Sequence, residues 1–321
     1  MEVAKDWKDY EIIDMANGEK LERWNNIVLI RPDPQIIWKE KTNPEKWSKA
    51  NARYIRSKTG GGEWNYKTQL PKSWQVHYKN LTFNIKPMGF KHTGLFPEQA
   101  VNWDWMINKI KNAKREIRVL NLFAYTGGAT VACLSAGATV CHVDSSKGMT
   151  EWAKENVASS GLQDKKVRFL IDDVNKFVQR EIRRGNKYDA IIMDPPSYGR
   201  GKNGEVWKFE DNIEDLVSLC MRVLSDKPLF FLINSYTTGI SSQVLENILR
   251  MNMQKEMNER TKNKAKCNTN EEASNKKLIN EIDKASEKKN LNGKFSNGEI
   301  GLNQTNSKNI LPCGIFAKWE E

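Results

Sequence analysis

The sequence predicts an α/β fold built on a doubly wound, mostly parallel sheet, with a small β-rich module at the N-terminal end. Between about residues 100 and 250, short continuous apolar runs alternate with stretches of helical periodicity. Continuous apolar strands are typical of a parallel sheet that is covered by helices on both faces. Right-handed crossover connections then give the doubly wound arrangement.

The first 90 residues have a different character. The run NIVLIRPDPQIIW is broken by Pro32 and Pro34, and TGGGEW reads as a turn. WQVHYKNLTFNIKP alternates in hydrophobicity on either side of Asn80, which predicts a β-hairpin. We therefore predict a β-rich module over residues 1–90 that binds substrate or RNA. Its Trp residues lie among Lys and Arg, which suits stacking on bases, although core and rim positions of a small β module also explain them.

Strands and helices alternate after residue 100. The predicted strands are RVLNLFA, TVCHVD, VRFLID, YDAIIMD and LFFLINS. The predicted helices cover Ala129–Ser135, Met149–Ser159, Val174–Arg184 and Ile213–Leu224. This alternation indicates βαβ units and a parallel sheet.

The C-terminal part changes composition after Leu249. It is dominated by Asn, Lys and Glu and has no aromatic residue before Phe295, so it buries too little apolar surface to offset its ordering entropy. We predict a disordered or loosely helical insertion over residues 252–296, within a domain of residues 91–321. GEIGL and ILPCGIFAKW then predict a terminal antiparallel pair, which brings the sheet to seven strands.

Composition indicates which kinds of partner the protein binds and which cellular compartment it occupies. The formal net charge of +11 favours a polyanion such as nucleic acid, although Lys is also simply a common surface residue. None of the five Cys is in C-x-x-C spacing, the first residues are charged, and no apolar run reaches the roughly 18 residues of a membrane span. We therefore expect a cytoplasmic protein with free thiols, no membrane contact and no metal site.

Two features of the first βαβ unit predict a nucleotide-like ligand. NLFAYTGG places Gly127 and Gly128 between a strand and a helix, where the backbone can approach a ligand closely, although any tight strand–helix turn needs glycine. Asp144 ends the next strand, where a carboxylate can accept both hydroxyls of a ribose. An N-cap role for Asp144 or Ser145 is compatible with this.

Two further features follow the next two strands. Asp172 and Asp173 end the third strand, where a carboxylate can accept from the amine of adenine or cap the next helix. DPPSYG follows a buried strand and offers the Asp194 carboxylate, rigid carbonyls at Pro195 and Pro196, and the Tyr198 ring. Such a group of acceptors under an aromatic ring suits a planar base that carries an amine.

These four features fall at the carboxyl ends of successive strands, where open α/β sheets bind ligands. A nicotinamide-dependent dehydrogenase explains the first two features and leaves DPPSY unexplained. A methyltransferase that uses S-adenosylmethionine explains all four.

VLNLFAYTGGAT, HVDSSKGMTEWAKEN, DDVNKFV, DAIIMDPPSYGRGKNGEVWK and NSYTTG together resemble the class I S-adenosylmethionine-dependent methyltransferases related to bacterial 23S rRNA large-subunit methyltransferases. Upstream, GFKHTGLFPEQ resembles the family segment K-T-G-x-F-x-D-Q, which covers the cofactor. The resemblance spans about residues 86–249 and implies a Rossmann-like methyltransferase sheet. The RNA-binding PUA module of some relatives has no counterpart here.

The resemblance and the residue patterns together give the predicted site. Asp194, Pro195, Pro196 and Tyr198 are the predicted catalytic residues. The predicted S-adenosylmethionine-binding residues are Lys91, Thr93, Phe96, Gln99, Phe123, Tyr125, Thr126, Gly127, Gly128, Asp144, Ser145, Asp172 and Asp173.

The chain departs from relatives that make 5-methylcytosine. Those relatives carry a nucleophilic Cys just after the strand that corresponds to LFFLINS, and Asn234, Ser235 and Tyr236 stand there in this chain. Carbon methylation without a nucleophile is disfavoured, so we predict methylation of a base nitrogen in rRNA. A protein side-chain amide, a small molecule, or a non-catalytic role in RNA binding are the alternatives.

Overall fold

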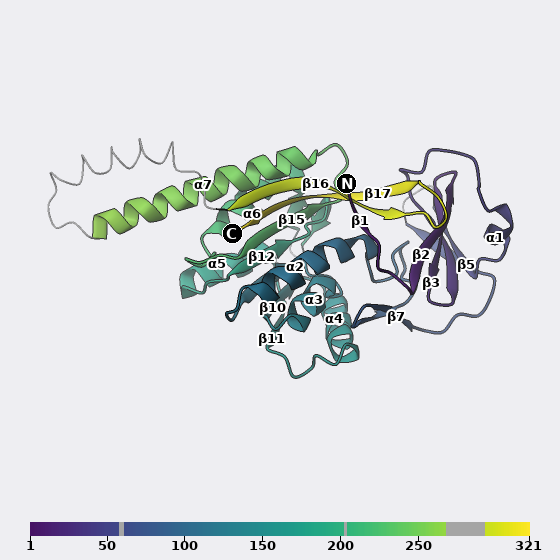
Figure 1. The fold of residues 1–321 in the computed structure, drawn as a ribbon, viewed down its shortest axis with the longest axis horizontal. Helices are drawn as coiled ribbons and strands as arrows, with labels where there is room; N and C mark the ends of the chain where they lie inside the picture. Colours follow the sequence, from purple (N-terminus) through teal and green to yellow (C-terminus); the bar gives the residue numbers. More distant parts are fainter. Residues whose placement is uncertain (58–60, 202–203, 268–292) are drawn as a thin grey trace.

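The computed structural model describes residues 1–57, 61–201, 204–267 and 293–321. Its largest element is an eight-stranded mixed sheet in the order β1-β16-β17-β15-β12-β9-β10-β11 (Figure 1). The strands are β1 (Glu2–Ala4), β9 (Arg118–Leu122), β10 (Thr139–Asp144), β11 (Val167–Ile171), β12 (Ala190–Met193), β15 (Phe230–Ser235), β16 (Lys294–Asn303) and β17 (Ile310–Glu320).

The predicted α/β fold is confirmed. Five adjacent strands run parallel to one another, in the order β15, β12, β9, β10 and β11. Strand β17 runs antiparallel to both β15 and β16. An eighth strand, β1, was not predicted and pairs in parallel with β16. Its three residues are too few to produce a recognisable pattern of alternation.

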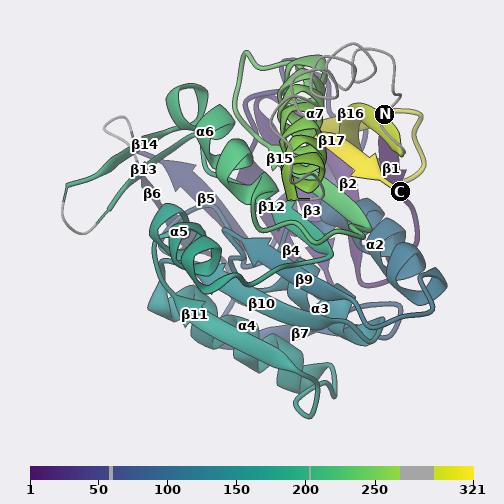
Figure 2. The same ribbon diagram turned by 90° about the vertical axis from the view of Figure 1, so that its left-hand side faces the viewer.

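Helices cover both faces of this sheet (Figure 2). They are α2 (Ala100–Asn112), α3 (Gly128–Ser135), α4 (Lys147–Ser159), α5 (Val174–Arg184), α6 (Phe209–Met221) and α7 (Ser242–Cys267). One core joins α2 and α3 to strand residues such as Val119 and Ile192. The other joins α5, α6 and α7 to Leu120 and Ile191, which point the opposite way because side chains alternate along a strand.

The N-terminal residues form a second, five-stranded sheet of β2 (Tyr10–Ala16), β3 (Glu19–Trp24), β4 (Ile27–Pro32), β5 (Ala52–Arg56) and β6 (Gly62–Tyr66), with the short helix α1 (Pro44–Ser48) beside it. The predicted hairpin is confirmed as β7 (Trp74–Tyr78) and β8 (Leu81–Ile85). It packs on α4, where the Asn84 backbone N–H donates to Asn156 Oδ1 at 2.8 Å. This contact places the hairpin beside the glycine loop, because Asn156 also donates to the Thr126 carbonyl.

The predicted insertion at 252–296 begins too early. Helix α7 continues to Cys267 (Figure 1). Its Met253 is fully buried against the core. The Arg260 guanidinium donates to the Met221 and Leu224 carbonyls near the end of α6. A few apolar contacts and one arginine therefore pack the first part of a segment whose average composition predicted disorder or a loose helix. Strand β16 resumes the sheet at Lys294, and residues 268–292 lie outside the described part of the chain.

Four cysteines lie where the sequence placed them, with Cys133 in α3, Cys141 in β10, Cys220 in α6 and Cys313 in β17, and all four are free thiols. Within the described ranges, no helix combines the length and apolarity needed to cross a membrane.

Candidate active site

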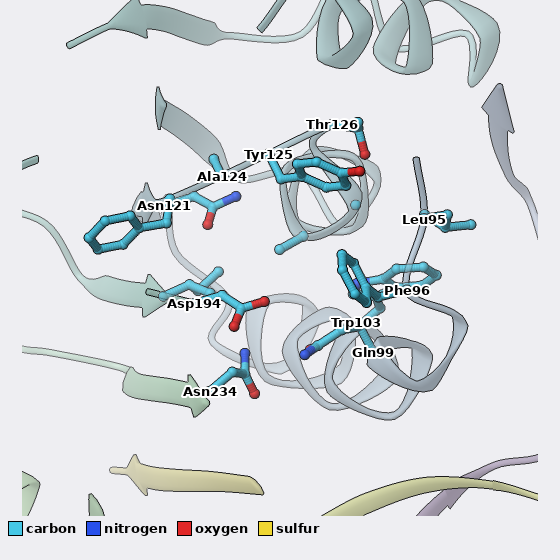
Figure 3. A pocket seen from close by; sticks show the side chains of 14 residues that line it. Leu95, Phe96, Gln99, Trp103, Asn121, Ala124, Tyr125, Thr126, Asp194 and Asn234 are labelled. Carbon is cyan, nitrogen blue, oxygen red and sulfur yellow. The ribbon is translucent and has the colours of Figure 1, made fainter. Parts of the chain in front are cut away.

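A pocket with about 460 Å³ of empty volume opens at the carboxyl ends of β9, β12 and β15 (Figure 3). The residues that line it are Leu95, Phe96, Gln99, Trp103, Asn121, Phe123, Ala124, Tyr125, Thr126, Gly128, Ala129, Ile192, Asp194 and Asn234. Seven of the predicted site residues are among them, namely Phe96, Gln99, Phe123, Tyr125, Thr126, Gly128 and Asp194.

The loop between β9 and α3 bends tightly around the pocket. Phe123, Tyr125 and Gly127 all have positive φ angles, of 54°, 51° and 82°. Gly127 does not line the pocket; it is the N-cap of α3, and a Cβ there would lie 2.9 Å from the Ala153 Cβ. Glycine is therefore required at position 127 by the close approach of α4 as well as by its backbone angle.

Asp144 lies at the end of β10 and supports this loop. Its Oδ2 accepts from the Tyr125 backbone N–H at 2.8 Å, and its Oδ1 accepts from the Ser146 N–H at 2.8 Å. Burial raises the pKa of this carboxyl above its usual value, and these two backbone donors oppose the rise. Each oxygen retains a lone pair for a ribose hydroxyl, so the predicted role is compatible with the geometry. Asp144 and its neighbour Ser145 both lie outside the pocket lining.

Asp172 and Asp173 lie at the end of β11 and do not line the pocket. Asp172 forms an ion pair with Arg180. Asp173 is the N-cap of α5, where its Oδ1 accepts from the Lys176 backbone N–H at 2.9 Å. Asp173 thus caps a helix, which was the alternative role that the sequence left open. Adenine binding by Asp172 or Asp173 stays a prediction.

The segment from Lys91 to Gln99 forms one wall of the pocket. Its Gly94 carbonyl accepts from the Thr126 hydroxyl at 2.5 Å, which joins the segment to the glycine loop. Its Lys91 carbonyl accepts from Arg31 of the N-terminal sheet at 3.0 Å. Lys91 and Thr93 themselves lie outside the pocket lining, and their contacts with a cofactor stay a prediction.

Asp194 follows β12 and projects into the pocket (Figure 3). Burial, together with the negative charge of Glu98, raises the pKa of this carboxyl to about 7. Pro195 is buried and Pro196 is exposed. Perturbation of this size at a pocket wall is typical of a functional carboxylate.

The Tyr198 ring does not cover Asp194 and lies outside the pocket. It is 51% exposed, on the short hairpin of β13 (Tyr198–Arg200) and β14 (Val206–Lys208), and it is not among the pocket-lining residues. The Arg200 Nε donates to its hydroxyl at 2.8 Å. Stacking by Tyr198 on a bound base stays a prediction.

A chain of hydrogen bonds behind the pocket was not predicted. The Tyr236 hydroxyl donates to Glu98 Oε1 and accepts from Gln99 Nε2, both at 2.9 Å. Asn102 Nδ2 donates to Gln99 Oε1 at 2.8 Å and to Asn234 Oδ1 at 3.0 Å. The segment NSYTTG therefore contributes Asn234 to the pocket wall and Tyr236 to the hydrogen bonds behind it.

Comparison with known proteins decides the family. A family profile described as S-adenosylmethionine-dependent methyltransferase matches residues 45–279. The crystal structure of an S-adenosylmethionine-dependent methyltransferase from Agrobacterium tumefaciens is 31% identical, covers 99% of this chain and 92% of that chain, and superimposes with a TM-score of 0.84. This chain belongs to the S-adenosylmethionine-dependent methyltransferases. The predicted resemblance, the enzyme class and the cofactor are confirmed.

Curated relatives carry names of ribosomal RNA methyltransferases. The ribosomal RNA large subunit methyltransferase K/L of Shewanella baltica is 31% identical over 178 residues, which are 53% of this chain and 23% of that protein. The ribosomal RNA large subunit methyltransferase I of Photobacterium profundum is 31% identical over 156 residues, or 48% of this chain and 38% of that protein. The chain thus spans about a quarter to two fifths of the length of these relatives.

The pocket fits the cofactor that the family uses. Apolar and aromatic side chains such as Phe96, Phe123 and Tyr125 line it, and the adjacent helix α3 begins at the glycine loop. Asp144 adds carboxylate oxygens at the edge of β10, next to this loop. S-adenosylmethionine is the methyl donor, and an aromatic pocket with carboxylate acceptors nearby suits its adenosine and its positively charged sulfonium.

Proposed function

We propose that this methyltransferase transfers a methyl group to a base nitrogen of rRNA. The observation that carries the proposal is the Asp194 carboxylate, which lies at the pocket wall with the Asn234 amide beside it. No cysteine lines the pocket within the described residues. A nitrogen with a lone pair needs no covalent activation, whereas a ring carbon does.

The residues of the chain have a limited chemical task. Bound S-adenosylmethionine supplies an already activated methyl group. Asp194, when ionised, accepts a hydrogen bond from the target N–H and directs the nitrogen lone pair at the methyl carbon. The transfer would exchange the S–C bond of the donor for the new N–C bond, and Asp194 would be placed to hold the proton that the nitrogen then loses. The aromatic lining keeps water out of this space.

The cysteines support a nitrogen target. Burial raises the pKa of Cys141 to about 11, and burial also raises the pKa of Cys313 well above its usual value. Thiols of this kind are protonated at neutral pH and are weak nucleophiles. A rRNA substrate also agrees with the net charge of +11 and with the names of the relatives, and it would place the protein in the cytoplasm.

The experiment is methyl transfer from labelled S-adenosylmethionine to purified ribosomal RNA, to ribosomes, and to ribosomes treated with ribonuclease. Nuclease-sensitive label supports the proposal, and label that resists nuclease and follows ribosomal protein indicates a side-chain amide instead. Asp194→Ala should abolish transfer while S-adenosylmethionine binding, measured by calorimetry, persists. RNA binding without transfer by the wild type would indicate a non-catalytic role.

A further inference from the structure

The hydrogen bonds behind the pocket have a fixed direction. An ionised Glu98 can only accept, so the Tyr236 hydroxyl donates to it and accepts from the nitrogen end of Gln99. The oxygen end of Gln99 therefore turns to Asn102 and accepts from its Nδ2 at 2.8 Å. A carboxylate at one end thus sets the orientation of each amide in turn.

The last amide in this chain is Asn234. Asn102 Nδ2 uses its second hydrogen to donate to Asn234 Oδ1 at 3.0 Å, and Asn102 Oδ1 has no partner among the described residues. Because the oxygen of Asn234 faces Asn102, its Nδ2 faces the pocket, and no described residue accepts from it. Asn234 is only 2% exposed, so its Nδ2 can meet little besides the contents of the pocket, where a ligand would accept from it.

Asp194 is the immediate neighbour of this donor. Strands β12 and β15 pair in parallel with Met193 opposite Ile233. The next residues therefore lie at the same level, with Asp194 just after β12 and Asn234 still within β15. Both side chains point into the same space, with the nitrogen end of Asn234 turned toward Asp194 (Figure 3). The pocket therefore presents one acceptor and one donor side by side.

Resting on the proposed function, we propose that Asn234 is a specificity-determining residue that reads the atom next to the methylated nitrogen. Asp194 accepts from the target N–H, and Asn234 Nδ2 donates to an acceptor that is joined to the target nitrogen through one carbon on the same edge. The substrate class is then an amidine or lactam edge, such as an exocyclic amine beside a ring nitrogen or a ring N–H beside a carbonyl.

This pairing excludes other positions on RNA. The N7 edge of guanine offers two acceptors and no N–H, so it would leave the ionised Asp194 facing a lone pair. A ribose hydroxyl offers no adjacent acceptor of the required kind, and a pyrimidine C5 has no N–H. A buried polar group that loses its partner costs free energy, which is how such a site rejects these alternatives.

The test pairs variants of the protein with an altered substrate. Mass spectrometry first identifies the nucleoside that the wild type methylates in rRNA. Oligonucleotides are then made with that nucleotide, or with its analogue in which the neighbouring acceptor is replaced by C–H. We expect the wild type to lose about 10- to 100-fold in kcat/KM on the analogue. Asn234→Ala should have a lower kcat/KM on the natural substrate. On the analogue its kcat/KM should fall by less than about a further threefold, because the donor is already gone.

Asn121→Ala is the matched control. Asn121 also lines the pocket, but its Nδ2 donates to the Thr130 hydroxyl at 2.9 Å. Its variant should retain the full wild-type loss on the analogue. The inference is overturned if the wild type and Asn234→Ala lose kcat/KM equally on the analogue. It is also overturned if the methylated product carries its methyl group on guanine N7, on a ribose oxygen or on carbon. This second outcome can be read even if Asn234→Ala does not fold. Absence of any transfer to RNA would refute the proposed function and this inference with it.

Discussion

The backbone N–H of Tyr125 donates to Oδ2 of Asp144 at 2.8 Å, so one carboxylate joins the glycine loop after β9 to the end of β10. The same carboxylate accepts from the Ser146 N–H through its other oxygen. Asp144 therefore has a structural task in addition to its predicted contact with the ribose. Variants at this position have to separate the two tasks.

Asp144→Ala leaves two backbone N–H groups without their acceptor, so we expect a loss of about 1–3 kcal/mol in the free energy of unfolding. Asp144→Asn keeps one acceptor oxygen and should lose less. Both should weaken S-adenosylmethionine binding about 10- to 100-fold, because neither retains two acceptors for the ribose. Denaturant unfolding and calorimetry give the two quantities. Unchanged affinity in Asp144→Asn would contradict the ribose assignment.

Asp173 also combines a structural role with a predicted role in cofactor binding. It is exposed, and it caps α5 by accepting from the Lys176 backbone N–H. Asp173→Ser keeps a capping oxygen but removes the carboxylate. Its stability should stay close to that of the wild type, whereas Asp173→Ala should lose about 1 kcal/mol. If Asp173 accepts from the adenine amine, both variants bind S-adenosylmethionine about 10-fold more weakly. If Asp173→Ser binds S-adenosylmethionine as tightly as the wild type does, Asp173 only caps the helix and does not bind adenine.

The order of strands and helices was predictable because apolar runs and helical periodicity record it directly. The glycine loop and Asp194 were predictable as well, since the carboxyl ends of parallel strands meet at one edge of the sheet. Tyr198 shows the limit of that argument. It follows Asp194 by four positions, but the turn of the chain at two prolines carries it onto an exposed hairpin.

The chain of hydrogen bonds behind the pocket was not predictable. Asn102 and Asn234 are 132 positions apart, and Asn102 lies in a helix where a polar residue ordinarily indicates a solvent-facing side. Only the packing of α2 against the end of β15 brings these amides together. The ordered part of α7 was not predicted for a related reason. A few specific contacts stabilise it, and the average composition of the segment does not reveal them.

The pKa of Asp194 predicts a pH dependence of catalysis. Burial and the Glu98 charge raise it to about 7, and the ionised form is the hydrogen-bond acceptor. We therefore expect kcat/KM to rise with pH through about 7 and to level off above it. Glu98→Gln removes the second cause and should move the midpoint to lower pH, which a pH–rate profile would show. A midpoint that does not move would mean that Glu98 has no electrostatic effect on Asp194.

The same shift has a consequence for stability. A carboxyl whose pKa is higher in the folded state favours folding at low pH, and this contribution is lost as pH rises from about 4 through about 7. Asp194→Asn lacks this pH-dependent loss. Its Tm should therefore exceed that of the wild type more at pH 8 than at pH 5, while methyl transfer is lost. A difference in Tm independent of pH would contradict the assigned pKa.

Gly94 offers a test of the wall formed by Lys91 to Gln99. Its φ is +95°, and a Cβ there would lie 2.3 Å from the ring of Trp152, which is buried and donates to the Asn84 carbonyl. Gly94→Ala should cost about 3 kcal/mol or more and weaken cofactor binding, since it combines backbone strain with overpacking. Gly137 has nearly the same φ, +94°, with nothing within 4 Å, so Gly137→Ala should cost only about 1 kcal/mol. Equal losses of stability in the two variants would show that the contact with Trp152 is unimportant.

Arg260 tests the ordered part of α7. Its guanidinium donates to the carbonyls of Met221, Leu224 and Ser225 at 3.0, 2.7 and 2.9 Å, and so caps the end of α6. Arg260→Ala leaves these carbonyls without that donor, and we expect a loss of about 1–3 kcal/mol in the free energy of unfolding. Lys255→Ala, at an exposed position on the same helix, should change it by less than about 0.5 kcal/mol. Denaturant unfolding of both variants decides between a packed helix, for which only Arg260→Ala is destabilising, and a disordered insertion, for which neither is.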